Sequence, residues 1–420
     1  MKKLTAGLVL GLCSAAVFAA TPTPEEMWAI IQQQQAEIAR LKEQVAAADA
    51  EIKETSVKVE QANVKVEATA SIVEEGMASG GKSLASSWTE RTQIGSYGEL
   101  HYNNLENQHG DGGSGDKDQL DFHRFVLFLS HDFSDTTRMF SEVELEHSVS
   151  GDDQPGEVEL EQAYIEHDLS SALHMRVGQF LIPVGILNQT HEPNTFYGVE
   201  RNNVEVNIIP TTWWEGGAAL NGELAPGWSF ETAFTSGFGL DADSGQWKVR
   251  DGRQKVAEAD ASDPAYTANM KYTGIAGLEV GGTVQYQQDI YQGGYSQDID
   301  AILYEAHLIY NSGPFGLRAL AASWDIDDAI DEIKSGADTQ EGWYIEPSWK
   351  LLRDLGVFTR YSEWDNQAGG SGDTQFSQWD LGLNYWLEEN VVLKLDYQFQ
   401  DAPADQKELD GLNLGVGWSF

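Results

Sequence analysis

From Thr92 to the C-terminus, apolar and polar residues alternate with a period of two. Each alternating segment is about ten residues long, which suits a strand that crosses a membrane in a closed barrel. In one clear segment, Val280 and Val284 alternate with Thr283 and Gln285, so we expect one face to meet lipid and the other water. A soluble β-sandwich would also alternate, but its strands would be shorter on average.

Sixteen such segments can be counted, and bacterial barrels have an even number of strands. Short polar turns alternate with longer connections rich in Gly and Asp, as periplasmic turns and extracellular loops do. The pattern predicts an all-β transmembrane barrel of 16 antiparallel strands with both ends in the periplasm. The expected starts are Thr92, Leu120, Thr137, Glu157, His174, Thr212, Gly227, Pro264, Gly277, Asp300, Phe315, Glu341, Gly356, Ser377, Asn390 and Asp410.

The last predicted strand ends the chain on an aromatic residue, Phe420, preceded on the same face by Leu414, Val416 and Trp418. A terminal aromatic that closes an alternating strand resembles the signal read by the barrel assembly machinery of the outer membrane. An exposed apolar terminus would be an aggregation liability in a soluble protein. We therefore predict that Phe420 is an assembly signal and that this machinery is a partner.

Residues 25–76 show a different period, with an apolar residue at every seventh position. This is the seam of an α-helical coiled coil. The second seam position is small or polar, so packing rules alone leave a dimer and a trimer both open. One long amphipathic helix folding back on the barrel is the alternative. The seam residues are Ile31, Ile38, Val45, Ile52, Val59, Val66 and Val73.

Two further segments complete the predicted organisation. Residues 1–19 have the charged start, apolar centre and small-residue end of a signal peptide. Residues 77–91 are rich in Gly, Ser and Ala and are predicted to be a flexible linker between the coiled coil and the barrel at 92–420. The only cysteine, Cys13, lies in the signal peptide, so the mature chain has no disulfide. No window is apolar enough for a transmembrane helix.

Charge and composition exclude several classes of function. The formal net charge of -41 argues against a nucleic-acid partner, because phosphates must be met by Lys and Arg. The 13 Trp, 15 Tyr, 16 Phe and 42 Gly argue against an acidic disordered chain. No G-x-S-x-G sequence occurs, and we expect neither an enzyme nor a cofactor.

Acidic clusters in the predicted loops raise the question of metal binding. One comprises Asp325, Asp327, Asp328, Asp331 and Glu332, and another comprises Asp111, Asp116 and Asp118. Neither has the spacing of an EF-hand. We expect solvated loops that contact lipopolysaccharide through divalent ions, and no dedicated metal site.

The residues from Arg176 to Gly185, Arg-Val-Gly-Gln-Phe-Leu-Ile-Pro-Val-Gly, carry a family resemblance. They resemble the R-x-G-Q-F-x-x-P-x-G motif of the phosphate-selective porin O and P family. Phe122-His123-Arg124, the run from Leu160 to Glu166, and Glu200-Arg201-Asn202 stand in the same order as in that family. The N-terminal coiled coil is similar to that of its dicarboxylate-type members.

The resemblance implies a homotrimer of barrels in the outer membrane, each enclosing a pore narrowed by an inserted loop. The long connection near 186–211, after the fifth predicted strand, is the candidate constriction. The expected function is passive diffusion of small hydrophilic solutes or ions, with lipid and lipopolysaccharide around the barrel. The alternative is a barrel that anchors a periplasmic coiled coil tethered to the cell wall. The filled barrel that this alternative predicts is disfavoured by the polar inward positions Thr283, Gln285, Gln287 and Gln398.

The acidity of the chain departs from phosphate-selective porins, which need convergent arginines. On the third strand, Glu142 and Glu144 indicate an acidic wall if that face is luminal. Basic residues on strands or in the constriction segment are the candidates for contact with a solute, although an arginine on a porin strand more often pairs with a carboxylate such as Glu346. The basic candidates are Arg124, Arg176, Arg201, Lys271, Arg318, Arg360 and Lys394.

Overall fold

The computed structural model describes residues 90–420 except 111–112, 152 and 328–334. The predicted signal peptide at 1–19, the coiled coil at 25–76 and nearly all of the linker at 77–91 lie outside the described residues. Their boundaries stay predictions, as does any role of Asp111, Asp328, Asp331 and Glu332.

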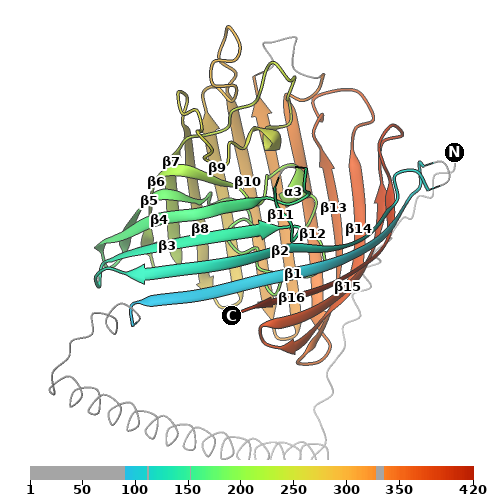
Figure 1. Cartoon of the computed structure of the whole chain (residues 1–420), viewed down its shortest axis with the longest axis horizontal. Coiled ribbons are helices and arrows are strands. Elements are labelled where there is room, and N and C mark those ends of the chain that lie inside the picture. Colours follow the sequence, from blue (N-terminus) through green and yellow to red (C-terminus); the bar gives the residue numbers. More distant parts are fainter. Residues whose placement is uncertain (1–89, 111–112, 152, 328–334) are drawn as a thin grey trace, which may run out of the picture. The chain divides into compact units, whose positions relative to one another are not determined.

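The described part of the chain forms one closed antiparallel barrel of sixteen strands (Figure 1). Each strand pairs with its neighbours in sequence, and β1 closes the ring on β16. The strands are β1 (Thr92–Asn107), β2 (Lys117–Asp132), β3 (Thr137–Glu146), β4 (Val158–Ser170), β5 (Leu173–Leu181), β6 (Trp214–Ala225), β7 (Trp228–Thr235), β8 (Ala265–Ile275), β9 (Leu278–Gln287), β10 (Ala301–Ser312), β11 (Phe315–Ile326), β12 (Thr339–Lys350), β13 (Leu355–Asp365), β14 (Phe376–Glu388), β15 (Val391–Asp401) and β16 (Leu409–Ser419).

The strands confirm the period-two prediction closely. Three strands begin at the predicted residue, and the largest difference is at β2, which begins at Lys117 instead of Leu120. A β-bulge opposite Glu99 to His101 of β1 gives β2 one extra residue, which ordinary alternation does not reveal.

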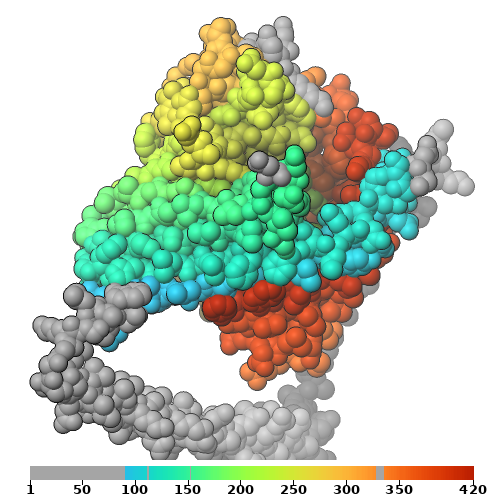
Figure 2. Space-filling model, in the orientation of Figure 1, coloured from blue at the N-terminus to red at the C-terminus, as the bar shows by residue number. Residues whose placement is uncertain are grey.

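The two faces of the strands differ as the alternation predicted. On β9, Val284 is 46% exposed on the outer face, whereas Gln285 is 1% exposed on the inner face. On β15, Leu395 is 38% exposed and Asp396 only 3%. Figure 2 shows the outer face over β1 to β4 as a continuous surface. Apolar side chains therefore cover the wall outside, and polar ones point into the lumen.

The chain terminus takes part in closing the ring. The backbone N–H of Phe420 donates to the carbonyl of Ser96 at 2.9 Å, and the N–H of Ser96 donates to the carbonyl of Phe420 at 3.0 Å. The Phe420 side chain is 73% exposed. Its backbone completes the seam between β1 and β16, while its ring is free for an external contact.

The two longest connections between strands fold into the lumen. They are residues 182–213, which include the short helix α3 (Val204–Asn207), and residues 236–264, which include the 3-10 helix η1 (Val249–Gly252). Both contribute to an apolar cluster against β10 to β13, where Trp213 stacks on Phe238 at 4.7 Å and both rings meet Trp324 of β11. One side of the lumen is thus filled by apolar side chains.

This packing corrects one inference from the sequence, because polar inward residues do not all face water. Thr283 donates a hydrogen bond to the carbonyl of Pro183 at 3.2 Å, and the Gln287 amide donates to the carbonyl of Phe238 at 2.8 Å. These side chains satisfy the backbone of the inserted segments, which would otherwise be buried without partners. Among the residues described, no helix is long and apolar enough to cross a membrane.

Candidate functional site: the lumen and its inserted segments

The inserted segment 182–213 crosses the lumen and is fixed to the opposite wall by charged side chains. Arg360 of β13 donates to the carbonyls of Tyr197 and Glu200, both at 3.3 Å. Arg318 of β11 donates to the carbonyl of Thr195 at 2.7 Å. The Asp396 carboxylate of β15 accepts a hydrogen bond from the backbone N–H of Val199 at 2.6 Å. The predicted constriction segment near 186–211 therefore does lie inside the barrel.

The segment also has an internal anchor that explains the last glycine of the R-x-G-Q-F-x-x-P-x-G motif. The buried Glu205 carboxylate accepts from the N–H groups of Ile186 and Leu187 at 2.7 and 2.6 Å. Gly185 has φ +67°, and a Cβ there would lie 2.5 Å from a Glu205 oxygen. Only glycine allows both this backbone conformation and the close carboxylate.

The inserted segments leave open a cavity of about 480 Å³ toward the barrel end that carries the long loops. We call it the outer cavity. Its walls are β1 to β4, β6 and β14 to β16 on one side and both inserted segments on the other. The charged residues that line it are Lys117, Arg124, Arg201, Arg250, Arg253 and Lys255, with Glu99, Glu146, Glu159 and Glu200. Although the whole chain is strongly acidic, the outer cavity has more basic than acidic side chains.

Most carboxylates of the outer cavity already have cationic partners. Glu99 lies 2.7 Å from Nε of Arg124. Glu200 lies 3.2 Å from Nδ1 of His101, and Glu159 is paired with Lys255. Burial alone would raise the pKa of Glu200, but the charge of His101 and its hydrogen bond hold that pKa well below its ordinary range. These carboxylates are thus neutralised by their own neighbours.

Three arginines of the outer cavity have no such partner among the residues that the structure describes. Arg201 donates from one nitrogen to the Thr212 hydroxyl at 2.9 Å, while its Nε and second terminal nitrogen bond to nothing among the described residues. Arg253 donates only to backbone carbonyls, including that of Thr212 at 2.7 Å. Arg250 forms no ion pair within the described part of the chain. Guanidinium groups with unused donors in a polar cavity attract an anion.

Arg250 and Arg253 were missed by the sequence analysis, which took basic candidates only from strands and from 186–211. They lie on the second inserted segment, 236–264. The signal that would have found them is the length of this connection, which rivals that of the predicted constriction. A second signal is the presence of the apolar residues Phe238 and Leu240 in this connection. Both are buried in the structure, whereas a solvated loop would expose such side chains to water.

The remaining sequence candidates are dispersed, and the basic ones among them contact a carboxylate, a carbonyl or an aromatic ring. Arg176 lies between Glu166 and Glu231 at 3.5 and 3.0 Å, and Lys271 is 3.9 Å from Glu279. Arg360 pairs with Glu346 and Asp380, and the Lys394 ammonium lies over the Phe196 ring at 3.5 Å. On the wall, Glu144 is 3.8 Å from Arg124, whereas Glu142 lies beside His191.

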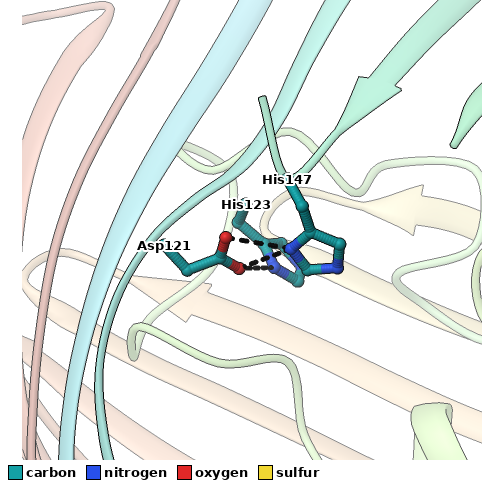
Figure 3. A group of neighbouring side chains, drawn as sticks. All are labelled: Asp121, His123 and His147. Carbon is teal, nitrogen blue, oxygen red and sulfur yellow. Dashed lines mark hydrogen bonds and ion pairs between the residues drawn. The ribbon is translucent and has the colours of Figure 1, made fainter. Parts of the chain in front are cut away.

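Beside His123, which lines the outer cavity, the Asp121 carboxylate lies between the imidazoles of His123 and His147 (Figure 3). His147 Nδ1 is 2.8 Å from one carboxylate oxygen, and His123 Nδ1 is 3.4 Å from the same atom. His123 also stacks on His101 at 4.7 Å between ring centroids. Because Asp121 accepts from both rings, the group is complete as a hydrogen-bonded cluster.

Comparison with known proteins agrees with this architecture. Residues 211–405 match the family model described as Gram-negative porin. A protein of Aquifex aeolicus strain VF5, described as uncharacterized, is 29% identical over 357 residues, covering 78% of this chain and 79% of its own.

Solved porins share the fold at low sequence identity. The anion-selective porin from Comamonas acidovorans matches with a TM-score of 0.55 at 13% identity, covering 78% of this chain and all of its own. OmpT of Vibrio cholerae, in a trimer form, matches with a TM-score of 0.51 at 10% identity, covering 79% of this chain and all of its own. At these identities the likeness establishes the barrel fold.

Proposed function

We propose that this outer-membrane porin, a non-enzymatic channel through which small solutes diffuse passively, binds small organic anions on their way through the outer cavity. The observation that carries the proposal is the set of Arg201, Arg250 and Arg253, which reach the cavity from two inserted segments and have no carboxylate partner within the described part of the chain. The carboxylate of a solute would form the ion pair that these three arginines lack.

Two electrostatic effects compete in such a channel. The acidic surface of the whole chain favours cations, but charges on exposed loops are screened beyond about 8 Å at physiological ionic strength. Charges in a narrow, partly desolvated passage are screened much less, so the three arginines dominate binding there. Bulk conductance is then weakly cation-preferring, while one class of anion is retained at the constriction formed by residues 186–211.

The assembly around this pore is part of the same proposal. The chain forms a trimer in the outer membrane, in contact with lipid and lipopolysaccharide, and residues 25–76 form a coiled coil in the periplasm joined by the linker at 77–91. The heptad seam supports the coiled coil, and the shared barrel fold of a porin with a trimer form supports the trimer. The motif from Arg176 to Gly185 favours the O and P branch of porins, although phosphate itself is not the favoured solute.

Liposome swelling tests the proposal. Vesicles containing the wild-type protein should swell in neutral sugars at rates that decrease with sugar size and do not saturate with concentration. In succinate, the rate should saturate. Arg201→Glu should abolish saturation by succinate and leave sugar permeation unchanged. Lys271→Glu, which alters a cation outside the outer cavity, is the matched control and should retain saturation. Linear uptake of succinate by the wild type would refute anion binding.

A further inference from the structure

On the other side of the inserted segment, three buried side chains direct unpaired atoms toward one another. They are Glu142 of β3, Glu161 of β4 and His191 of the segment 182–213, with exposures of 1%, 1% and 3%. His191 Nε2 lies 3.6 Å from Oε1 of Glu142 and 3.7 Å from Oε2 of Glu161. None of these three atoms has a hydrogen-bond partner among the described residues.

The hydrogen bonds around these side chains fix which atoms face the centre. His191 Nδ1 bonds the carbonyl of Asn188 at 3.1 Å. A carbonyl only accepts, so Nδ1 carries the proton and Nε2 presents a lone pair to the two carboxylates. Gln162 donates to the other oxygen of Glu142 at 2.6 Å. A ring orientation set by a backbone carbonyl and a carboxylate held by a neighbouring amide are the usual supports of metal ligands.

Electrostatics makes this arrangement costly without a cation. Two carboxylates and a lone pair are buried at one point, where unpaired charge is expensive. His191 Nε2 lies within 3.7 Å of both carboxylates, and with the ring proton held on Nδ1 it can serve as a ligand.

We propose that Glu142, Glu161 and His191 bind a divalent transition-metal ion, of which Zn²⁺ is the representative, and that this ion ties the inserted segment to the barrel wall. An ion about 2.0–2.2 Å from each ligand atom fits between atoms at these separations. Two carboxylates with one imidazole suit Zn²⁺ or Mn²⁺ better than Ca²⁺ or Mg²⁺, which prefer oxygen ligands alone.

Two features of the fold serve the site. The register shift between β3 and β4 gives β4 an extra residue at Glu161, as a bulge that turns this carboxylate into the lumen. Glu142, Gln162 and His191 also line a cavity of about 520 Å³ that reaches Phe420. This cavity is the entry path for the ion, and it lies apart from the arginines of the outer cavity. The prediction of no dedicated metal site concerned only the acidic loop clusters, and these three ligands could not be grouped from the sequence because they belong to three different segments.

Metal content of the purified full-length protein tests the proposal. After chelator treatment and dialysis against Zn²⁺, the wild type should retain one Zn²⁺ per chain by mass spectrometry. Glu161→Gln and His191→Gln should lose this ion. Glu144→Gln is the matched control, since it removes an equally buried carboxylate of the same strand, and it should retain the ion. Absence of Zn²⁺ from the wild type would overturn the proposal in favour of a proton shared by the two carboxylates.

Two further measurements cover variants that fail to fold and ions bound elsewhere. Co²⁺ added to the chelator-treated wild type should give the visible absorption of a site with nitrogen and oxygen ligands, and its absence would overturn the proposal. Loss of Zn²⁺ in His147→Gln but not in Glu161→Gln would place the ion in the group of Figure 3, which also contradicts the site proposed here.

Discussion

Arg360 illustrates at the scale of one residue why the arginines of this lumen differ in role. Its guanidinium, 3% exposed, pairs with Asp380 and Glu346 and also holds two carbonyls of the inserted segment. Arg360→Gln removes the ion-pair partner of two buried carboxylates, at a cost of about 3–5 kcal/mol. Denaturant unfolding should show this loss of stability. Single-channel recordings should show a noisier current, because the inserted segment is held less firmly. Arg318→Gln, which removes a bond to one neutral carbonyl, should cost about 1 kcal/mol, and an equal loss in both would refute the distinction.

Phe420 is a second case at the scale of one residue. Its backbone closes the barrel on Ser96, whereas its ring is exposed and is predicted to act as an assembly signal. Phe420→Ala keeps the two backbone hydrogen bonds with Ser96 and removes only a ring that is 73% exposed. We expect a severalfold drop in the amount assembled in the outer membrane, with an unchanged denaturation temperature for the molecules that do assemble. Phe399→Ala, which removes an exposed ring from β15, should leave the yield intact. An unchanged yield in Phe420→Ala would exclude the role of the ring as a signal.

At the scale of elements, the strands could be predicted from the sequence and the inserted segments only in part. Each strand has one face in lipid, so its pattern is set by its own neighbours on the wall. The segment 236–264 has no period, and its place in the lumen depends on contacts with residues far away in the chain, such as Trp324. For the same reason the basic candidates taken from the sequence did not include Arg250 and Arg253, because the pairing that decides which arginine is available to a solute depends on contacts between distant segments.

The apolar cluster provides the prediction for the inserted segments. Trp324 packs on Trp213 and Phe238 and donates to the carbonyl of Ile208 at 3.0 Å, so one side chain touches both segments. Trp324→Ala should destabilise the barrel by about 3–5 kcal/mol and raise the single-channel conductance as the segments loosen. Trp379→Ala, at a position 50% exposed on the outer face, should change neither property much. Unaltered conductance in Trp324→Ala would show that the cluster does not shape the passage.

At the scale of the whole molecule, the pore and the N-terminal region are predicted to act independently. Every residue that lines the two cavities lies after Thr92, whereas the predicted coiled coil occupies 25–76. Deleting 25–76 should therefore leave the single-channel conductance near that of the intact protein, even if trimers become less stable. A channel that closes after the deletion would favour a role for the coiled coil in the pore. Absence of conduction in both the intact protein and the deletion variant would favour the alternative in which the barrel only anchors a coiled-coil tether.

The central claim, an acidic channel with an unpaired arginine site in its passage, is tested most directly by the reversal potential of single channels across a KCl gradient, with and without succinate. We predict a small reversal potential of the sign for cation preference. Succinate should reduce the current to a plateau in the wild type, whereas Arg201→Glu should keep or increase the cation current and show no plateau. Strong anion selectivity of the wild type in dilute salt would contradict this account, because the arginines would then outweigh the carboxylates throughout the pore.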